Sequence, residues 1–115
     1  MTIQHVPTFA VETHGCKLNQ ADSQLLIREF TEAGYLNVSS GSVADVYVLN
    51  TCTVTHIADR KARQSMRAMR RRNPEALVVV TGCYAERSPS EVSRIEGVDV
   101  VYGNNDKQRL VQQVS

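Results

Sequence analysis

Two features are missing from the 115-residue sequence, and each absence excludes a class of protein. No stretch approaches the roughly 18 consecutive apolar residues that a membrane-spanning helix needs. The first seven residues lack the basic and then apolar pattern of a secretory signal peptide. We therefore expect a cytoplasmic protein without a membrane segment.

Net charge and cysteine are also scarce. The net charge is only +1, so the chain as a whole is no general binder of polyanions. The three cysteines are an odd number and lie far apart, whereas secreted disulfide frameworks prefer even counts and dense spacing. In a reducing compartment such thiols are more often buried, catalytic or metal-binding.

The composition that remains is that of one ordinary globular domain spanning residues 1–115. Hydrophobic residues make up 42% and charged residues 22%, which is enough apolar material for one modest core. Strand-like and helix-like patterns alternate along the chain. Strands are predicted at 8–13, 35–38, 45–51, 77–81 and 98–102, and helices at 19–33, 56–72, 89–97 and from 103 onward.

Punctuating residues support these boundaries. Asn19 is a plausible N-cap of the first helix, and Gly34 would end that helix. Pro74 would close the long helix, and Ser88-Pro89-Ser90-Glu91 forms a capping box. The alternation predicts an α/β fold in which a five-stranded parallel sheet is covered by helices on both faces. The flavodoxin-like strand order 2-1-3-4-5 fits best.

Each cysteine lies just beyond a predicted strand. Cys16 follows the first strand, Cys52 the third and Cys83 the fourth. In the proposed order these strands are neighbours, and parallel strands end at one edge of the sheet, where ligands bind. Thiolates select zinc or iron–sulfur clusters. Because a four-iron cluster usually takes four cysteines, three ligands would leave one position open for chemistry.

Two other interpretations compete with a cluster. The cysteines could be small buried hydrophobes in a flavodoxin-like binding module that has no cluster. Alternatively, His14 or His56 would complete a Cys₃His zinc site. Asn19 and Asn50 could donate hydrogen bonds to sulfur, although helix caps or turns explain asparagines equally well.

Four short motifs resemble those of a known family, in order and at suitable spacing over nearly the whole chain. They are Thr-His-Gly-Cys-Lys-Leu-Asn-Gln at 13–20, Asn-Thr-Cys-Thr-Val-Thr at 50–55, Thr-Gly-Cys-Tyr-Ala at 81–85 and Gly-Asn-Asn-Asp-Lys at 103–107. Together they resemble the N-terminal domain of the radical-SAM methylthiotransferases.

The resemblance implies a flavodoxin-like domain in which Cys16, Cys52 and Cys83 hold an auxiliary [4Fe-4S] cluster. The open iron would carry the sulfur or methylthio group to be transferred. A second [4Fe-4S] cluster on another domain would cleave S-adenosylmethionine and generate the radical that activates the substrate. No residue of the present domain is expected to be catalytic in itself.

Within the family, the branch that acts on threonylcarbamoyl-adenosine beside the tRNA anticodon is the most similar. The similarity lies in the first two cysteine motifs and in Ala-Asp-Arg-Lys-Ala-Arg-Gln at 58–64. The branch that acts on isopentenyl-adenosine in tRNA is the alternative. The branch that acts on a ribosomal protein tends to have Pro-Lys-Asn after the first cysteine, which this chain lacks.

One motif expected of a complete enzyme is missing. A radical-SAM core needs Cys-x-x-x-Cys-x-x-Cys, and no cysteine remains to supply it. The RNA-binding C-terminal domain of the tRNA-modifying branches is missing too. We therefore expect the chain to be part of a longer enzyme, able to bind a cluster but not to turn over alone.

The predicted helix 56–72 holds seven of the thirteen basic residues and only one acid, Asp59. At helical spacing the apolar Ala58, Ala62, Met66 and Met69 share one face. The opposite face would carry arginines suited to phosphate contact with tRNA, or would simply be a solvated surface. These arginines are Arg60, Arg63, Arg67, Arg70 and Arg71.

Overall fold

The computed structural model describes residues 6–14, 17–39, 41–51, 56–82, 89–95 and 98–101. All three cysteines fall outside these ranges, as do Ser88 and the predicted helix after residue 103. The described elements are β1 (Thr8–Thr13), α1 (Lys17–Glu32), β2 (Leu36–Asn37), β3 (Val46–Thr51), α2 (His56–Arg72), β4 (Leu77–Gly82), α4 (Pro89–Ser93) and β5 (Val100–Val101).

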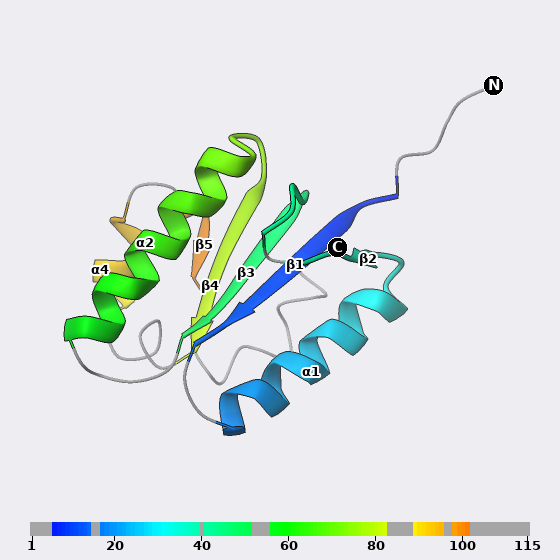
Figure 1. The fold of residues 1–115 in the computed structure, drawn as a ribbon, viewed down its shortest axis with the longest axis horizontal. Coiled ribbons are helices and arrows are strands. Elements are labelled where there is room, and N and C mark those ends of the chain that lie inside the picture. Colours follow the sequence, from blue (N-terminus) through cyan, green and yellow to red (C-terminus); the bar gives the residue numbers. More distant parts are fainter. Residues whose placement is uncertain are drawn as a thin grey trace.

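The sheet has the predicted topology. Its five strands run in the order β2-β1-β3-β4-β5, and every neighbouring pair is parallel. Figure 1 shows the arrowheads of β1, β3 and β4 meeting at one edge of the sheet, close to the first turns of α1 and α2. The fold class and the strand order 2-1-3-4-5 are therefore confirmed.

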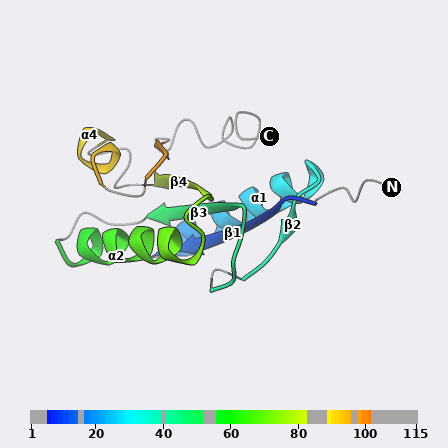
Figure 2. The ribbon, with the colours of Figure 1, turned by 90° about the horizontal axis from the view of Figure 1, so that it is seen from above.

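Helices cover both faces of this sheet, because its central strand is apolar on both sides. All six residues of β3 are buried. Val48 packs with Leu26 and Phe30 of α1, whereas Leu49 packs with Met66 of α2 on the opposite face. Val92 of α4 belongs to the α2 side, and Figure 2 shows α4 beside the β4 end of the sheet. None of the helices described is long and apolar enough to cross a membrane.

The first helix differs from the prediction at its start and agrees with it at its end. It begins at Lys17, so Asn19 is a residue of its first turn and not its N-cap. Gly34 has φ +100, and the amide of Tyr35 donates to the carbonyl of Phe30. This is the left-handed glycine cap by which helices commonly end. The ring of Tyr35 packs edge-on against the ring of Phe30, with the two ring centroids 5.1 Å apart.

The outer elements are shorter than the sequence suggested. Of the predicted strand 98–102, β5 covers 100–101, while 98–99 are not strand and residue 102 lies outside the described residues; β2 covers only 36–37 of 35–38. The helix α4 starts at Pro89 as predicted but ends at Ser93. Edge strands gain hydrogen bonds on one side only, so apolar pattern alone overestimates how far they pair.

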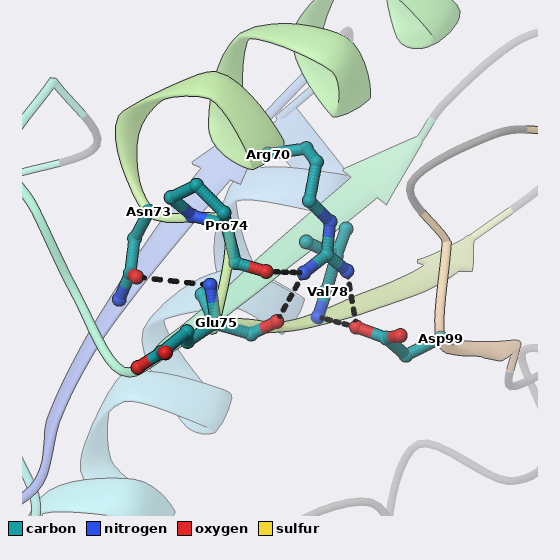
Figure 3. A network of polar contacts seen from close by, with 7 residues as sticks. Arg70, Asn73, Pro74, Glu75, Val78 and Asp99 are labelled. Carbon is teal, nitrogen blue, oxygen red and sulfur yellow. Dashed lines mark hydrogen bonds and ion pairs between the residues drawn. The ribbon is translucent and has the colours of Figure 1, made fainter.

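Arg70 at the end of α2 ties that helix to the start of β4 and to the segment before β5. Its guanidinium donates to the carbonyl oxygens of Pro74 at 2.7 Å and Ala76 at 2.8 Å. It also forms an ion pair of 2.5 Å with Asp99, whose carboxylate accepts a hydrogen bond from the amide of Val78. Figure 3 shows these contacts converging on one side chain. Arg70 was predicted to lie on the RNA-facing surface of the helix. It instead links three segments of the fold, and below it is called a structural clamp.

Gly82 ends β4 at a point where no side chain fits. Its φ is +98, and a Cβ built there would lie 2.1 Å from the carbonyl oxygen of Thr51. Because glycine has no Cβ, the backbone at Gly82 can approach that of β3 this closely. The residue therefore sets how closely the ends of β3 and β4 pack.

We predict that Arg70→Gln lowers the free energy of unfolding of the chain by about 1–2 kcal/mol, because it removes the ion pair and two charged hydrogen bonds. Urea denaturation checks this. Arg67→Gln is the matched control, since Arg67 is exposed and should change stability by less than about 0.5 kcal/mol. Equal effects of the two substitutions would show that Arg70 is no clamp.

We also predict that Gly82→Ala destabilises the fold by about 2 kcal/mol or more, since backbone strain and overpacking add. Two glycines serve as controls in the same denaturation series. Gly34→Ala meets nothing within 4 Å and should cost only the strain of its φ of +100. Gly41→Ala has neither problem and should be nearly neutral. A ranking in which Gly82 is not the most costly would refute the close approach.

Candidate metal centre at the carboxyl edge of the sheet

The ends of β1, β3 and β4 are aligned in register at one edge. Thr13 pairs with Asn50, and Asn50 pairs with Thr81 on the other side. One residue further along, Thr51 pairs with Gly82, and the amide of His14 donates to the carbonyl of Asn50 at 2.9 Å. The three strands therefore leave the sheet side by side, about 4.8 Å apart.

In the sequence each of these strand ends leads at once into a cysteine. Cys52 is the residue after Thr51, and Cys83 is the residue after Gly82. Cys16 comes two residues after His14. The fold thus brings the three cysteine-bearing segments to the same edge from adjacent strands. Convergence of the thiols themselves concerns residues that the structure does not describe, and it stays a prediction.

Two helices begin at this same edge. The first residue of α1, Lys17, directly follows Cys16, and α2 begins at His56, four residues after Cys52. The N-terminus of a helix carries partial positive charge and lowers the pKa of a nearby thiol. The edge is therefore suited to thiolates and to the negative charge of a sulfur-rich centre.

A row of polar side chains underlies the edge on the α1 side. It is formed by Thr13, Asn50 and Thr81, where the strands change from apolar to polar residues, and by Ser23 of α1. The hydroxyl of Thr13 donates to Ser23 Oγ at 2.6 Å, and Asn50 Nδ2 donates to the same oxygen at 3.0 Å. The amide of Asn50 therefore connects β3 to α1, and it is neither a helix cap nor a turn residue.

Thr81 differs from the rest of this row. Its side-chain hydroxyl is fully buried, and it has no hydrogen-bond partner among the residues that the structure describes. Its carbonyl oxygen, in contrast, accepts a hydrogen bond of 2.7 Å from the hydroxyl of Thr51. An unsatisfied buried hydroxyl costs about 1–3 kcal/mol. Thiolate or sulfide at the end of β4 would supply the acceptor, so the edge fits a sulfur-rich group.

On the α2 side the edge carries a compact cluster of three polar residues, Glu12, His14 and Ser65. His14 Nε2 lies 2.6 Å from Glu12 Oε2, and Ser65 Oγ of α2 donates to the same carboxylate oxygen. The His14 side chain is about nine-tenths buried, at 10% exposure. The cluster joins the end of β1 to the inner side of α2.

The hydrogen bond from His14 lowers the pKa of Glu12, and the hydroxyl of Ser65 and the positive charge of Arg72 act in the same direction. Burial opposes them by disfavouring the charged carboxylate. Because the pKa of Glu12 is depressed by folding, this contact stabilises the fold above the ordinary pKa of the carboxyl. The contribution is lost as the pH falls through the depressed value.

The Glu12–His14–Ser65 cluster also bears on the alternative of a Cys₃His zinc site. His14 Nε2 is engaged by Glu12, so this nitrogen is not available to a Cys₃His site in the arrangement observed. The side chain of His56 lies outside the described part of the structure. Across the described residues, no group of three or more histidine, cysteine, aspartate or glutamate side chains is placed to hold a metal.

Sequence reasoning missed Glu12, Ser23 and Ser65. The available signal was weak, since Glu12 is the one charged residue within a strand that is otherwise apolar or threonine. His14 is two residues from Glu12, which is the spacing of one face of a strand, but Ser65 is 53 residues away and no local spacing relates it to Glu12.

The basic face of α2 is only partly as predicted. Ala62, Met66 and Met69 are buried against the sheet, which confirms the apolar face. Arg60, Arg67 and Arg71 are exposed. Arg63 and Arg70 are half-buried instead, and they pair with Glu91 at 3.8 Å and Asp99 at 2.5 Å. Exposed cations therefore remain on only part of the face.

Among curated proteins the chain is similar to tRNA methylthiotransferases. It is 50% identical over 103 residues to the threonylcarbamoyladenosine tRNA methylthiotransferase MtaB of Aquifex aeolicus, covering 90% of this chain and 25% of that protein. The protein of the same name in Bacillus subtilis is 45% identical, with 90% and 23% covered. A tRNA-2-methylthio-N(6)-dimethylallyladenosine synthase of Chloroherpeton thalassium is 36% identical, with 81% and 22% covered.

The chain therefore spans about a quarter of the length of the curated relatives it matches. Solved structures show likeness of fold alone. A response regulator of Burkholderia multivorans superposes with TM-score 0.60 at 14% identity, over 96% of this chain and 93% of that one. A short-chain flavodoxin associated with a bacterial microcompartment gives TM-score 0.58 at 11% identity, over 92% and 93%.

The match to a family model agrees with the resemblance seen in the cysteine motifs. It runs over residues 8–103, from the start of β1 to beyond β5, and so includes all three cysteines. The chain belongs to the family described as uncharacterized protein family UPF0004.

Proposed function

We propose that this chain is the auxiliary-cluster domain of an enzyme that adds a methylthio group to threonylcarbamoyl-adenosine in tRNA. One observation carries the proposal. The ends of β1, β3 and β4 lie in register at one edge, and each is followed within three residues by one of the three cysteines. Relatives named as methylthiotransferases, 45–50% identical over nine-tenths of the chain, support the activity.

The choice of substrate depends on the relatives. The two at 50% and 45% identity carry the threonylcarbamoyladenosine name, whereas the dimethylallyladenosine synthase is at 36%. The motifs around Cys16 and Cys52 favour the same branch. Methylthiotransfer to isopentenyl-adenosine in tRNA is the second candidate.

In this proposal Cys16, Cys52 and Cys83 hold a [4Fe-4S] cluster as thiolates. When bound, the cluster supplies an iron position that carries the sulfur to be transferred. The chain's own residues shape the edge around it. Gly82 lets the ends of β3 and β4 approach closely, the helix N-termini favour negative charge, and the Thr81 hydroxyl offers a hydrogen bond.

The Glu12–His14–Ser65 cluster has a supporting role in the same proposal. It anchors the last residues of β1 to α2 and keeps a partly buried carboxylate hydrogen-bonded near the edge. The segment that carries Cys16 starts from this anchored point.

The remaining chemistry belongs to other domains of the proposed enzyme. They would supply a second [4Fe-4S] cluster, the cleavage of S-adenosylmethionine and the RNA-binding domain. We place the enzyme in the cytoplasm, where tRNA is modified. By itself the 115-residue chain should bind the auxiliary cluster and should not transfer sulfur.

Anaerobic reconstitution of the chain with iron and sulfide tests the proposal. We predict a brown protein with about four irons per chain, and loss of the colour and of specific iron in Cys83→Ser. Thr13→Val is the matched control, because it alters the same edge without removing a thiol. In the enzyme that contains this chain, Cys83→Ser should remove the methylthio group from threonylcarbamoyl-adenosine in digested tRNA.

Each other outcome of the reconstitution is informative. A colourless chain that retains one zinc would replace the cluster by a structural zinc site. A chain that binds neither metal, and folds equally well with all three cysteines changed to serine, would be a flavodoxin-like binding module. Loss of the methylthio group from isopentenyl-adenosine instead would shift the substrate to the second candidate.

A further inference from the structure

The outward side of α2 carries one continuous row of exposed side chains, three of which are arginines. It consists of Arg60, Gln64, Arg67 and Arg71, and is called the outer stripe below. The spacings of four, three and four residues place them on a single line along the helix. At 1.5 Å per residue the stripe is about 16 Å long.

The structure separates this stripe from the other arginines of α2, while Lys61 is also exposed but lies off the line of the stripe, beside Arg60. Arg63 faces Glu91, Arg70 is held by Asp99 and two carbonyls, and Arg72 is half-buried within the electrostatic reach of Glu12. In the part of the chain that the structure describes, no acidic side chain pairs with an arginine of the stripe. The helix thus spends some arginines on the fold and leaves these three facing solvent.

Helix stability does not explain the stripe. Arg60 lies in the second turn of α2, near the N-terminus, where the helix dipole disfavours a cation. Arg67 and Arg71 are four residues apart and repel each other, which costs a helix a few tenths of a kcal/mol. Only Arg71, in the last turn, is favoured by the dipole. A bound polyanion would offset this repulsion, because its negative charge attracts both arginines.

The other helical layer shows no comparable surface. Among the described side chains of α1, the charged residues are Asp22, Arg28, Glu29 and Glu32, which are mainly acidic. The two helices cover opposite faces of the sheet (Figure 1). Between the described side chains of these two helices, only those of α2 form an exposed positive row, so a polyanion would approach from the α2 side.

We propose that the outer stripe binds the sugar–phosphate backbone of the RNA that carries the base to be modified. This inference rests on the proposed function, which supplies an RNA substrate, and it names the surface that would hold that substrate. An exposed guanidinium group donates two parallel hydrogen bonds to two phosphate oxygens. It loses little hydration in doing so, because it is weakly hydrated. Because α2 starts at the carboxyl edge, RNA lying along the stripe extends outward from the candidate metal centre.

A salt titration of RNA binding tests the stripe. The cluster-free chain is mixed with a fluorescently labelled anticodon stem–loop RNA, and the anisotropy is followed from about 50 to 200 mM salt. The double variant Arg60→Gln/Arg67→Gln is compared with the double variant Arg28→Gln/Arg94→Gln. The second variant removes the same amount of charge from α1 and from the residue that follows α4. Circular dichroism confirms that both variants stay folded.

We expect the stripe pair to weaken RNA binding about tenfold at low salt. The slope of log affinity against log salt is negative, and its magnitude should be smaller by about 1.4–1.8 in this variant, which corresponds to two lost phosphate contacts. The control pair should change both quantities much less. Vesicles containing an anionic phospholipid, tested in parallel, should bind weakly and without dependence on the stripe.

Three results would overturn the inference. They are equal losses in the two variant pairs, no measurable RNA binding by the unmutated chain at about 50 mM salt, or stripe-dependent binding to vesicles in place of RNA. Iron incorporation is measured separately on the same chain. A chain that holds the cluster without stripe-dependent RNA binding contradicts only this inference, whereas the reverse result contradicts only the proposed cluster function.

Discussion

The in-register pairing of β1, β3 and β4 is the constraint on which the rest of the molecule depends. Parallel strands must all leave the sheet at one edge, and the pairing of Thr13 with Asn50 and of Asn50 with Thr81 makes the three ends level. A slip of one residue would turn each strand's side chains to the opposite face. Both the apolar layers and the polar edge would then be lost together.

The same strands change chemistry at their ends. Their central residues are mainly buried apolar side chains that pack against α1 on one face and α2 on the other. Their last residues form the polar row on the α1 side and the Glu12–His14–Ser65 cluster on the α2 side. A buried polar layer contributes little net stability unless it is satisfied, and the Thr81 hydroxyl is not satisfied within the described chain. The unsatisfied hydroxyl of Thr81 supports our proposal that a sulfur-rich group binds at this edge.

Sequence patterns predicted the central architecture well, because strand and helix signals were strong there. The bounds of β1 and α2 agree with the prediction to the residue, and Gly34 caps α1 as expected. The start of α1 was predicted two residues late, because asparagine is a favoured N-cap residue and Asn19 is the predicted cap, whereas the helix begins at Lys17. Short edge strands were overestimated because pattern does not show where pairing stops.

The site was predictable only in outline. Strand order placed the ends of β1, β3 and β4, which precede the three cysteines, at one edge. A helical projection could not show that Arg70 reaches Asp99, 29 residues away, while Arg67 stays exposed. Glu12 and Ser65 likewise meet across 53 residues through the packing of α2 on β1. Such contacts depend on the folded layers rather than on local spacing.

The most direct test of the account is whether the three thiols converge in the folded, cluster-free chain. Each cysteine is changed to serine in turn, the chain is oxidised mildly at low concentration, and the remaining pair is mapped by mass spectrometry. The account predicts an intramolecular disulfide in the variants that keep the neighbouring pairs Cys16–Cys52 and Cys52–Cys83, since bonding requires Cα atoms within about 7 Å. Two free thiols, or only disulfides between chains, in either variant would contradict a shared site at this edge.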